Sequence, residues 1–439
     1  MKPWDYGPLR VNETERYFSN GKQPFFWLGD TAWLLFSRLT ENEAYDYLMN
    51  RKQKGYNVIQ ATLIHEWPQK NFEGANALKY NSFSSPDLAS GYWQRIDNII
   101  NIAEELGIYF ALLPTWGSNV KSGCLNMDNI DAYMDFLLER YGLRPNVIWL
   151  VGGDVRGDCA LELFSHMGHR LKGGSRDQLV GFHPFGRTSS SLWFHKESWL
   201  DFNMFQSGHR RYDQVNMNAW DDGGEREGIY GEDNWRYVRR DLARTPLKPV
   251  LDGEPSYEQI LQGLHDETQP YWQAADVRRY AYWSVFSGAC GHTYGDNAIM
   301  QFFNKKRDEK GAFGVRQDWK EAMHNPGCAH MVHLKQLMEK VNFQKGSSED
   351  YLVLNGQDER YCHISVFTTE EDLLAYVYEP HAFALSLRKY EGELSAYWFN
   401  PENGISSYIG RVNGGKTQSF RPPARLEGQS DWVLILHKE

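Results

Sequence analysis

The chain has 439 residues, of which 41% are hydrophobic and 24% charged, the usual make-up of a globular protein with more than one domain. Its net charge of −10 and pI near 5.8 argue against a nucleic-acid partner, because nucleic-acid binding calls for a basic face. No run of about 18 apolar residues occurs, so we expect no membrane span, and the first residues lack the apolar core of a signal peptide. The compartment and the oligomeric state remain open.

Aromatic residues are unusually frequent, at 15% of the chain, and include 16 Trp and 25 Tyr. The C–H face of a sugar packs well on an aromatic ring, so this composition is typical of carbohydrate sites. Aromatic side chains also fill ordinary cores, and composition does not separate the two interpretations.

Eight short apolar segments alternate with helical patterns from residue 24 to residue 295. We expect strands at 24–31, 57–65, 108–117, 146–154, 178–184, 202–209, 248–255 and 288–295. Eight strand–helix units predict a parallel (β/α)₈ TIM barrel. A doubly wound open sheet is the alternative, but it rarely needs eight such units.

Helix boundaries between these strands are marked by standard signals. Thr40 with Glu43 three residues later forms a capping box, and Gly107 ends the helical pattern of 92–107. Further helices are expected at 130–142, 159–172, 230–242, 270–286 and 318–341. The acid Asp158 is expected to be the N-cap of the helix that follows it.

After residue 342 the pattern changes to short alternating runs separated by turn residues, such as "RYCHISVFTT" and "DWVLIL". Such runs without helices are typical of an antiparallel β-sandwich. We therefore expect a barrel domain at 1–342 and a β-sandwich domain at 343–439.

Polar and aromatic side chains stand at the predicted carboxyl ends of the barrel strands, where the active sites of such barrels lie. As residues that contact substrate we predict Asp30, Trp33, His65, Glu66, Trp116, His183, His209, His292 and Tyr294.

Two carboxylates at strand ends are the candidate catalytic groups. Asp154 ends the fourth strand and Glu254 the seventh, on opposite sides of the barrel mouth. Glycosidic hydrolysis needs such a pair, one as proton donor and the other as nucleophile or base. The structural alternative is that each acid pairs with a nearby arginine, such as Arg156. Glu258, one turn beyond Glu254, is a rival nucleophile that is less well aimed.

Other chemistries fit the sequence less well. "GGDVRG" (152–157) lacks the glycine spacing of a dinucleotide loop, and Asp154 would repel a phosphate. "HEWPQ" (65–69) is not H-E-x-x-H. The histidines 65, 183, 209 and 292 would form a metal site only if they converged, and the five scattered cysteines favour neither a disulfide framework nor a zinc site. We expect no metal and no cofactor.

Four segments in combination resemble the apiosidase-type glycoside hydrolases of glycoside hydrolase family 140. They are "FFWLGDTAW", "NVIWLVGGD", "VLDGEPSYE" and "GACGHTYGDNAIMQF", and the C-terminal "AYWFNPENG" with "DWVLIL" resembles the collagen-binding-type β-sandwich often attached to them. The resemblance covers essentially the whole chain. It implies a retaining hydrolase with Asp154 as acid/base and Glu254 as nucleophile, acting outside the cytoplasm on an apiose bond in the pectin rhamnogalacturonan-II. Barrel glycosidases commonly present Asn-Glu at strand four, whereas this chain has Gly153-Asp154.

The sequence thus predicts an enzyme that hydrolyses O-glycosyl bonds of an oligosaccharide or polysaccharide. Two alternatives stay open at this point. One is a non-catalytic carbohydrate-binding or scaffold protein with a degenerate barrel, and the other is a metal-dependent hydrolase.

Overall fold

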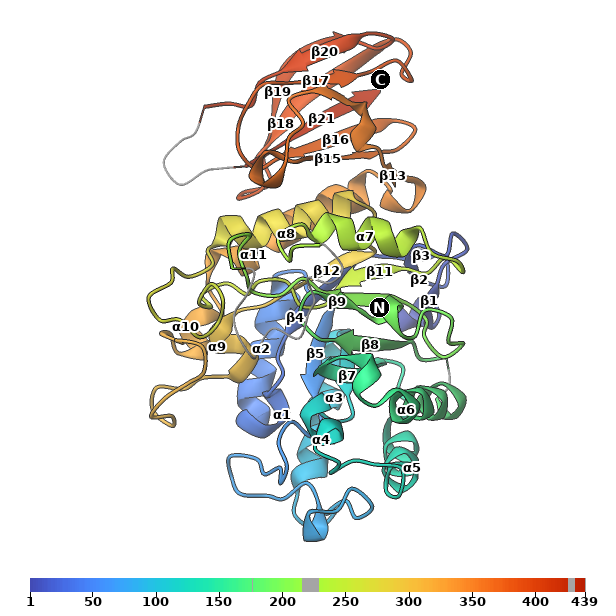
Figure 1. Cartoon of the computed structure of the whole chain (residues 1–439), viewed down its shortest axis with the longest axis vertical. Helices are drawn as coiled ribbons and strands as arrows, with labels where there is room; N and C mark the ends of the chain where they lie inside the picture. Colours follow the sequence, from blue (N-terminus) through green and yellow to red (C-terminus); the bar gives the residue numbers. More distant parts are fainter. Residues whose placement is uncertain (176, 215–228, 425–430, 439) are drawn as a thin grey trace.

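The computed structural model of the chain describes residues 1–175, 177–214, 229–424 and 431–438. In Figure 1, strands surrounded by helices form the larger lower body, and a smaller body built of strands lies above it.

The larger body is built on a nine-stranded sheet in the order β8-β7-β6-β5-β4-β12-β11-β10-β9. All eight predicted strands are present and run parallel, while the short β9 (Thr188–Ser189) is antiparallel to β10. Because β10 also lies beside β8, the sheet curls into a nearly closed barrel, and the predicted (β/α)₈ fold is confirmed. The parallel strands are β4 (Trp27–Thr31), β5 (Val58–Thr62), β6 (Tyr109–Leu113), β7 (Val147–Val155), β8 (Val180–Pro184), β10 (Asn203–Gln206), β11 (Val250–Asp252) and β12 (Gly291–Tyr294).

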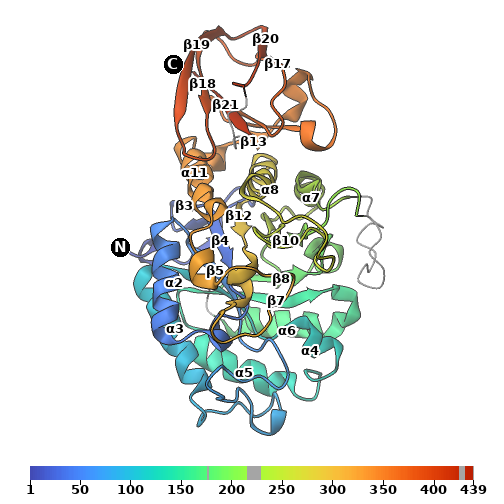
Figure 2. The ribbon, with the colours of Figure 1, turned by 90° about the vertical axis from the view of Figure 1, so that its left-hand side faces the viewer.

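Helices cover the outside of the barrel, and their ends follow the predicted signals (Figure 2). The Oγ1 atom of Thr40 accepts a hydrogen bond from the backbone N–H of Glu43, and Gly107 ends α3 with a left-handed φ of 72°. The predicted helix at 318–341 is divided in two, because Pro326 starts a new helix. The helices are α1 (Leu35–Arg38), α2 (Glu41–Gln53), α3 (Tyr92–Leu106), α4 (Gly117–Lys121), α5 (Ile130–Tyr141), α6 (Leu161–Gly174), α7 (Asn234–Leu242), α8 (Ala274–Phe286), α9 (Asn297–Gln301), α10 (Trp319–Ala322) and α11 (Pro326–Lys340).

A small antiparallel sheet at the start of the chain covers the N-terminal end of the barrel. It consists of β1 (Leu9–Val11), β2 (Phe18–Asn20) and β3 (Gln23–Phe25). The ring of Phe18 lies 5.5 Å from that of Phe202 and 6.1 Å from that of Trp27, at the beginnings of two barrel strands. The opposite end of the barrel is therefore the end that stays open to a ligand.

The C-terminal region is a sandwich of two antiparallel sheets, as predicted. A six-stranded sheet has the order β13-β15-β16-β21-β18-β19 and a three-stranded sheet the order β14-β17-β20. The strands are β13 (Ser347–Ser348), β14 (Val353–Asn355), β15 (Ile364–Thr368), β16 (Asp372–Val377), β17 (Phe383–Ser386), β18 (Glu393–Phe399), β19 (Ser406–Asn413), β20 (Thr417–Phe420) and β21 (Trp432–Lys438). The division at residue 343 stays a prediction.

The central strands of the six-stranded sheet are buried on both faces, whereas the edge strand β19 is mostly exposed. Side chains alternate along a strand, so Leu373 and Ala375 of β16 pack toward the three-stranded sheet, while Leu374 and Tyr376 pack toward the barrel. Tyr376 stacks on Tyr282 of α8 with the ring centroids 4.7 Å apart. The sandwich thus rests on the helices of the barrel wall, around α8 and α11 (Figures 1 and 2).

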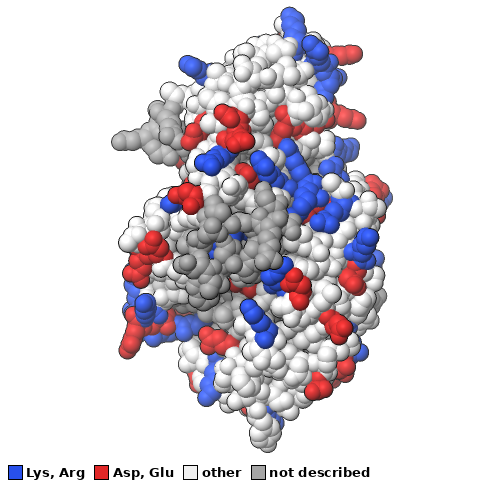
Figure 3. Space-filling view, viewed as in Figure 1, with Lys and Arg blue, Asp and Glu red and all other residues white. Residues whose placement is uncertain are grey.

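The surface is mixed in charge. On the face shown in Figure 3, acidic and basic side chains are interspersed over both bodies, so the net charge of −10 is not gathered in one place on this face. Within the described ranges, none of the helices has the length and apolar character that a membrane crossing requires.

Candidate active site

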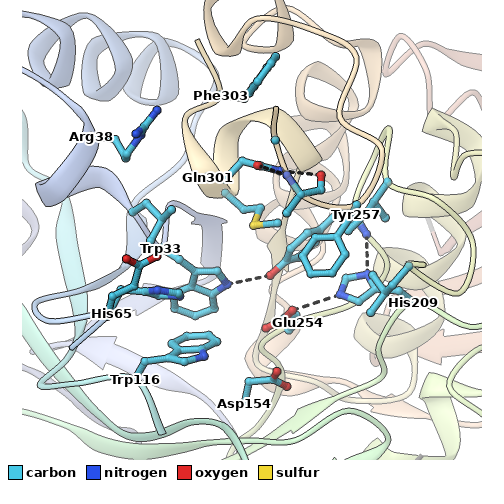
Figure 4. A pocket seen from close by; sticks show the side chains of 18 of the residues that line it. Trp33, Arg38, His65, Trp116, Asp154, His209, Glu254, Tyr257, Gln301 and Phe303 are labelled. Carbon is cyan, nitrogen blue, oxygen red and sulfur yellow. Dashed lines mark hydrogen bonds and ion pairs between the residues drawn. The ribbon is translucent and has the colours of Figure 1, made fainter. Parts of the chain in front are cut away.

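A cavity of about 710 Å³ lies at the carboxyl ends of the barrel strands (Figure 4). Both predicted catalytic acids line it, and so do five of the predicted substrate-contacting residues: Trp33, His65, Glu66, Trp116 and His209. His183 lies next to this lining, in contact with Trp33 and Glu254. The structure thus brings together side chains from strands that are far apart in the sequence.

Glu254, two residues after β11, is almost fully buried between two histidines. Its Oε1 lies 3.1 Å from Nε2 of His209, in hydrogen-bond geometry. Its Oε2 lies 3.1 Å from Nε2 of His183, close enough for electrostatic attraction to an N–H there but outside the geometry of a good hydrogen bond. Burial opposes ionisation of the carboxyl, but the two histidines outweigh it and lower the pKa of Glu254. Glu254 is therefore held as a carboxylate.

Backbone N–H groups decide which nitrogen of each histidine faces Glu254. Nδ1 of His209 accepts from the N–H of Tyr257 at 3.4 Å, and Nδ1 of His183 accepts from the N–H of Asp154 at 3.3 Å. A neutral imidazole that accepts at Nδ1 carries its hydrogen on Nε2. Both rings are thus oriented as donors toward the Glu254 carboxylate.

Asp154 reaches the cavity through a bulge at the end of β7. Three successive residues have positive φ, 93° at Gly152, 105° at Gly153 and 54° at Asp154, and the pairing with β8 shifts register there. A Cβ on Gly152 would lie 2.5 Å from the carbonyl oxygen of His183, and one on Gly153 would lie 2.9 Å from the nitrogen of Gly117. Both glycines are needed for this turn, which points Asp154 toward Glu254 (Figure 4).

Asp158, four residues after Asp154, does not have the role expected from the sequence. Arg156 forms its ion pair with Asp158, at 2.7 Å. Asp158 belongs to a short 3₁₀ turn, and α6 begins after Ala160 with no side-chain cap. The prediction of Asp158 as an N-cap is therefore wrong, because its carboxylate is bound by Arg156 and lies too early in the chain.

Aromatic rings form one wall of the cavity. Trp33 and Trp116 lie 5.1 Å apart at 60°, and Nε1 of Trp33 donates to the hydroxyl of Tyr257 at 3.2 Å. His65 stacks against Trp116 at 4.8 Å, and burial lowers the pKa of His65 to about 4. Nδ1 of His65 is buried without a hydrogen-bond partner among the described residues. This wall offers apolar ring faces and a neutral histidine, which suits the C–H faces and hydroxyls of a sugar.

Three predicted substrate-contacting residues are not brought to the cavity: Asp30, His292 and Tyr294. Asp30 is fully buried, paired with Arg51 and bound by the hydroxyl of Tyr47 at 2.6 Å. His292 is enclosed, and burial lowers its pKa to about 3.

The alternation of side chains along a strand explains these misplaced residues. Thr293 accepts from Nε1 of Trp27 at 3.2 Å, and Gly29 adjoins both, so these three share one face of the sheet. Asp30, His292 and Tyr294 occupy the opposite face. The hydroxyl of Tyr294 there donates to Glu258 at 2.6 Å, so the rival carboxylate Glu258 is also buried away from the cavity.

Several residues that line the cavity were not predicted from the sequence. Tyr257 and Gln206 face the cavity, and so do Met300, Gln301 and Phe303, which follow β12. Oε1 of Gln206 is buried without a hydrogen-bond partner among the described residues. The segment "GDNAIMQF" after the eighth strand was the available signal, since loops after barrel strands build the mouth.

The four histidines considered as metal ligands do not gather into one cluster. His183 and His209 flank Glu254, His65 stacks on Trp116, and His292 lies outside the cavity. Across the part of the chain that the structure describes, no group of three His, Cys, Asp or Glu side chains is arranged to hold a metal ion.

Two family models match the chain, one over the barrel and one over the C-terminal region. The family described as "Apiosidase-like, catalytic domain" matches residues 12–345, and the "Putative collagen-binding domain of a collagenase" matches residues 349–437. No curated protein matches the chain.

Solved structures resemble the chain over its whole length. A protein named a glycoside hydrolase is 39% identical with a TM-score of 0.93, covering 100% of this chain and 98% of its own. A glycoside hydrolase family 5 protein from Bacteroides vulgatus ATCC 8482 is 38% identical with a TM-score of 0.92, covering 100% of this chain and 94% of its own. A third structure, from the same organism, is 13% identical and shares the fold, with a TM-score of 0.65 and coverage of 99% and 83%. With its barrel matched by the family model, the chain belongs to the apiosidase-like family and is a glycoside hydrolase.

Proposed function

We propose that this enzyme is a retaining glycoside hydrolase of pectin side chains that cleaves a bond to apiose in rhamnogalacturonan-II. In this proposal Glu254 is the nucleophile and Asp154 the acid/base. The observation that carries it is a carboxylate held ionised by two histidines and facing a second carboxyl group across one cavity (Figure 4).

Glu254 suits the role of nucleophile because it is ionised before substrate arrives. The lowered pKa keeps it charged at neutral pH, the Nε2–H of His209 holds one carboxylate oxygen, and Nε2 of His183 lies 3.1 Å from the other. Each carboxylate oxygen has two lone pairs, so one that accepts from a histidine still has a lone pair for the anomeric carbon.

Asp154 suits the role of acid because a fixed negative charge faces it. The charge of Glu254 favours the protonated form of a nearby carboxyl. In the first step an oxygen of Glu254 bonds to the anomeric carbon, the glycosidic C–O bond breaks, and the proton of Asp154 passes to the leaving oxygen. In the second step Asp154 takes a proton from water, the hydroxyl bonds to the anomeric carbon, and Glu254 leaves as a carboxylate.

The size and lining of the cavity support a short branched sugar chain as substrate. A volume of about 710 Å³ accommodates a few sugar rings, and Trp33 and Trp116 offer faces for their C–H groups. His65 and Gln206 carry buried polar atoms that hydroxyl groups of the sugar can satisfy. A pectin substrate places the enzyme in the periplasm or outside the cell.

The test is hydrolysis of rhamnogalacturonan-II oligosaccharides by Glu254→Gln and Asp154→Asn, followed by chromatography of the released sugar. We expect turnover to fall by about a thousandfold or more in Glu254→Gln and by about a hundredfold or more in Asp154→Asn. Glu258→Gln is the matched control, since that buried glutamate lies outside the cavity, and it should keep wild-type turnover once its fold is checked by circular dichroism.

The stereochemistry of the first product decides the mechanism. We expect NMR spectra taken early in the reaction to show the anomer of the substrate, as in a double displacement. The opposite anomer would exclude Glu254 as a nucleophile, and release of a sugar other than apiose would overturn the substrate assignment.

A further inference from the structure

The described residues between β10 and α7, together named the β10–α7 loop, carry His209 near their start and Glu232 near their end. Its two described ends, 207–214 and 229–233, are joined at the base. The backbone N–H of Tyr212 donates to Oε2 of Glu232 at 3.2 Å, and the hydroxyl of Tyr212 donates to Asp233 at 2.7 Å. The position of Tyr212, three residues after His209, thus depends on Glu232.

The carboxylate of Glu232 is in turn bound by a residue of the C-terminal sandwich. Its carboxylate is completely buried and accepts from Nη2 of Arg279 at 3.0 Å. The hydroxyl of Tyr361 lies 2.9 Å from one oxygen and 3.0 Å from the other. Tyr361 belongs to the turn Arg360–Cys362 that precedes β15. A buried carboxylate depends on every donor it has, because its charge is costly to bury.

Ring contacts tie the same residues together. The rings of Tyr212 and Tyr361 lie 5.5 Å apart, and the guanidinium of Arg360 lies 5.1 Å from the ring of Tyr212. The guanidinium of Arg279, on α8, lies 4.7 Å from the ring of Tyr361 and 4.8 Å from that of Tyr378. The sandwich therefore contributes three side chains to the cluster that fastens the loop.

His209, in the first described end of this loop, contacts Glu254, the candidate nucleophile. Its carbonyl accepts from the N–H of Gly263 at 2.7 Å and from Nε1 of Trp272 at 3.1 Å, and its Nε2 lies 3.1 Å from Glu254. We infer that the C-terminal sandwich takes part in catalysis by position: Tyr361, acting through Glu232 and Tyr212, holds His209 against Glu254. This inference rests on the proposed role of Glu254 as nucleophile.

The decisive variant is Tyr361→Phe in the full chain, which removes one O–H donor and keeps the ring contacts with Tyr212 and Arg279. With rhamnogalacturonan-II oligosaccharide as substrate we expect kcat to fall about threefold to tenfold and KM to stay within about twofold. Among the described residues, the titratable groups that lie against Glu254 are His183, His209, Asp154 and Tyr257.

The pH profile gives a readout that a merely structural role would not move. Glu254 reacts in its ionised form, so the acid limb of kcat/KM follows its pKa. A displaced His209 no longer stabilises the charge, so we expect the acid limb of Tyr361→Phe to move upward by about half a pH unit.

Tyr376→Phe is the matched control. The hydroxyl of Tyr376 donates to the buried Asp431 at 2.9 Å, and Asp431 is paired with Arg278 of α8, the neighbour of Arg279. This second tyrosine–carboxylate–arginine set joins the same two bodies, and it makes no hydrogen bond with the described ends of the loop, 207–214 and 229–233. Tyr376→Phe should lose similar thermal stability and keep the wild-type kcat and acid limb. In a His209→Ala background, Tyr361→Phe should have no further effect on the acid limb.

A crystal structure of Tyr361→Phe provides a readout independent of turnover. We expect the distance between Nε2 of His209 and Oε1 of Glu254 to exceed 3.5 Å, or His209 to adopt a second orientation. An unchanged His209, or kinetics identical to those of Tyr376→Phe, overturns the inference while the function proposed for Glu254 stands. Wild-type activity in Glu254→Gln refutes that function separately, whatever the position of His209.

Discussion

At the scale of single residues, the charge of Glu254 is set by one hydrogen atom on each of two flanking rings. His183 and His209 both accept a backbone N–H at Nδ1, so both present Nε2–H to the carboxylate. The folded backbone thus sets the orientation of both rings toward Glu254.

The pH dependence of activity should report this arrangement. The folded-state pKa of Glu254 lies below its ordinary value, so activity should persist to low pH and fall only as the carboxylate takes up a proton. In His209→Ala one donor is lost and the pKa rises, so we expect the acid limb of kcat/KM to move upward by about one unit. His65→Ala is the control, since His65 lines the cavity without contacting Glu254; it should raise KM and leave the acid limb in place. An unmoved limb in His209→Ala would contradict the assignment.

Asp30, near the end of β4, contributes to the stability of the fold. With Arg51 and Tyr47 it forms a fully buried set behind the barrel wall. We expect Arg51→Met to lower the free energy of unfolding by about 3–5 kcal/mol, because Asp30 would remain as an uncompensated buried charge. The double variant Asp30→Asn/Arg51→Met should recover part of this loss. Urea unfolding of the three proteins checks it, and equal losses in the single and double variants would argue against charge burial as the cause.

At the scale of elements, the bulge in β7 links strand geometry to chemistry. Gly153 has a φ of 105° and no room for a Cβ, so Gly153→Ala must shift the chain beside Asp154. We expect a loss of about 1–3 kcal/mol in unfolding free energy together with a fall in kcat of at least about tenfold.

Gly173→Ala is the control for the bulge. A Cβ on Gly173, within α6, would meet nothing within 4 Å, so this variant should match or slightly exceed the wild type in stability. Thermal unfolding and kcat, measured for the two alanine variants, test whether the bulge in β7 positions Asp154. A Gly153→Ala enzyme with wild-type kcat would show that the bulge does not aim the acid.

Sequence patterns predicted the elements well because their signals are local. The capping box at Thr40, the final Gly107 and the apolar strand runs each depend on a few neighbouring residues. The site was harder to predict, because both faces of a buried parallel strand are apolar and the pattern does not say which face points inward. That ambiguity placed His292 and Tyr294 in the cavity and left Gln206 out, while Tyr257 lies in the segment after β11, where no strand pattern applies.

At the scale of the whole molecule, the barrel and the sandwich share one hydrophobic cluster. Tyr282 and Phe286 of α8 pack with Tyr376 and Phe367 of the sandwich, and Arg278 pairs with Asp431. The C-terminal region therefore has a structural role, because it packs against the helices of the barrel wall.

Removing residues 346–439 should accordingly destabilise the barrel. The truncation exposes the apolar side of α8 and leaves Arg278 without its buried carboxylate, so we expect aggregation or a marked fall in melting temperature. Size-exclusion chromatography and thermal unfolding measure this, with the full chain as reference. A monodisperse barrel with the wild-type melting temperature would show that the two parts are independent.

The pairing of Arg278 with Asp431 also affects the timing of folding during synthesis. The two residues are 153 positions apart, and Asp431 directly precedes β21, the last strand of the described residues. At ordinary rates of translation, roughly ten to thirty seconds pass between the synthesis of the arginine and that of its partner. Until then Arg278 has, among the described residues, only the partly exposed Glu402 as an anionic partner, so we expect the contact between α8 and the sandwich to be completed late in synthesis. A chain that stops before Asp431 lacks the buried carboxylate that pairs with Arg278, so we expect it to be less stable than the full chain.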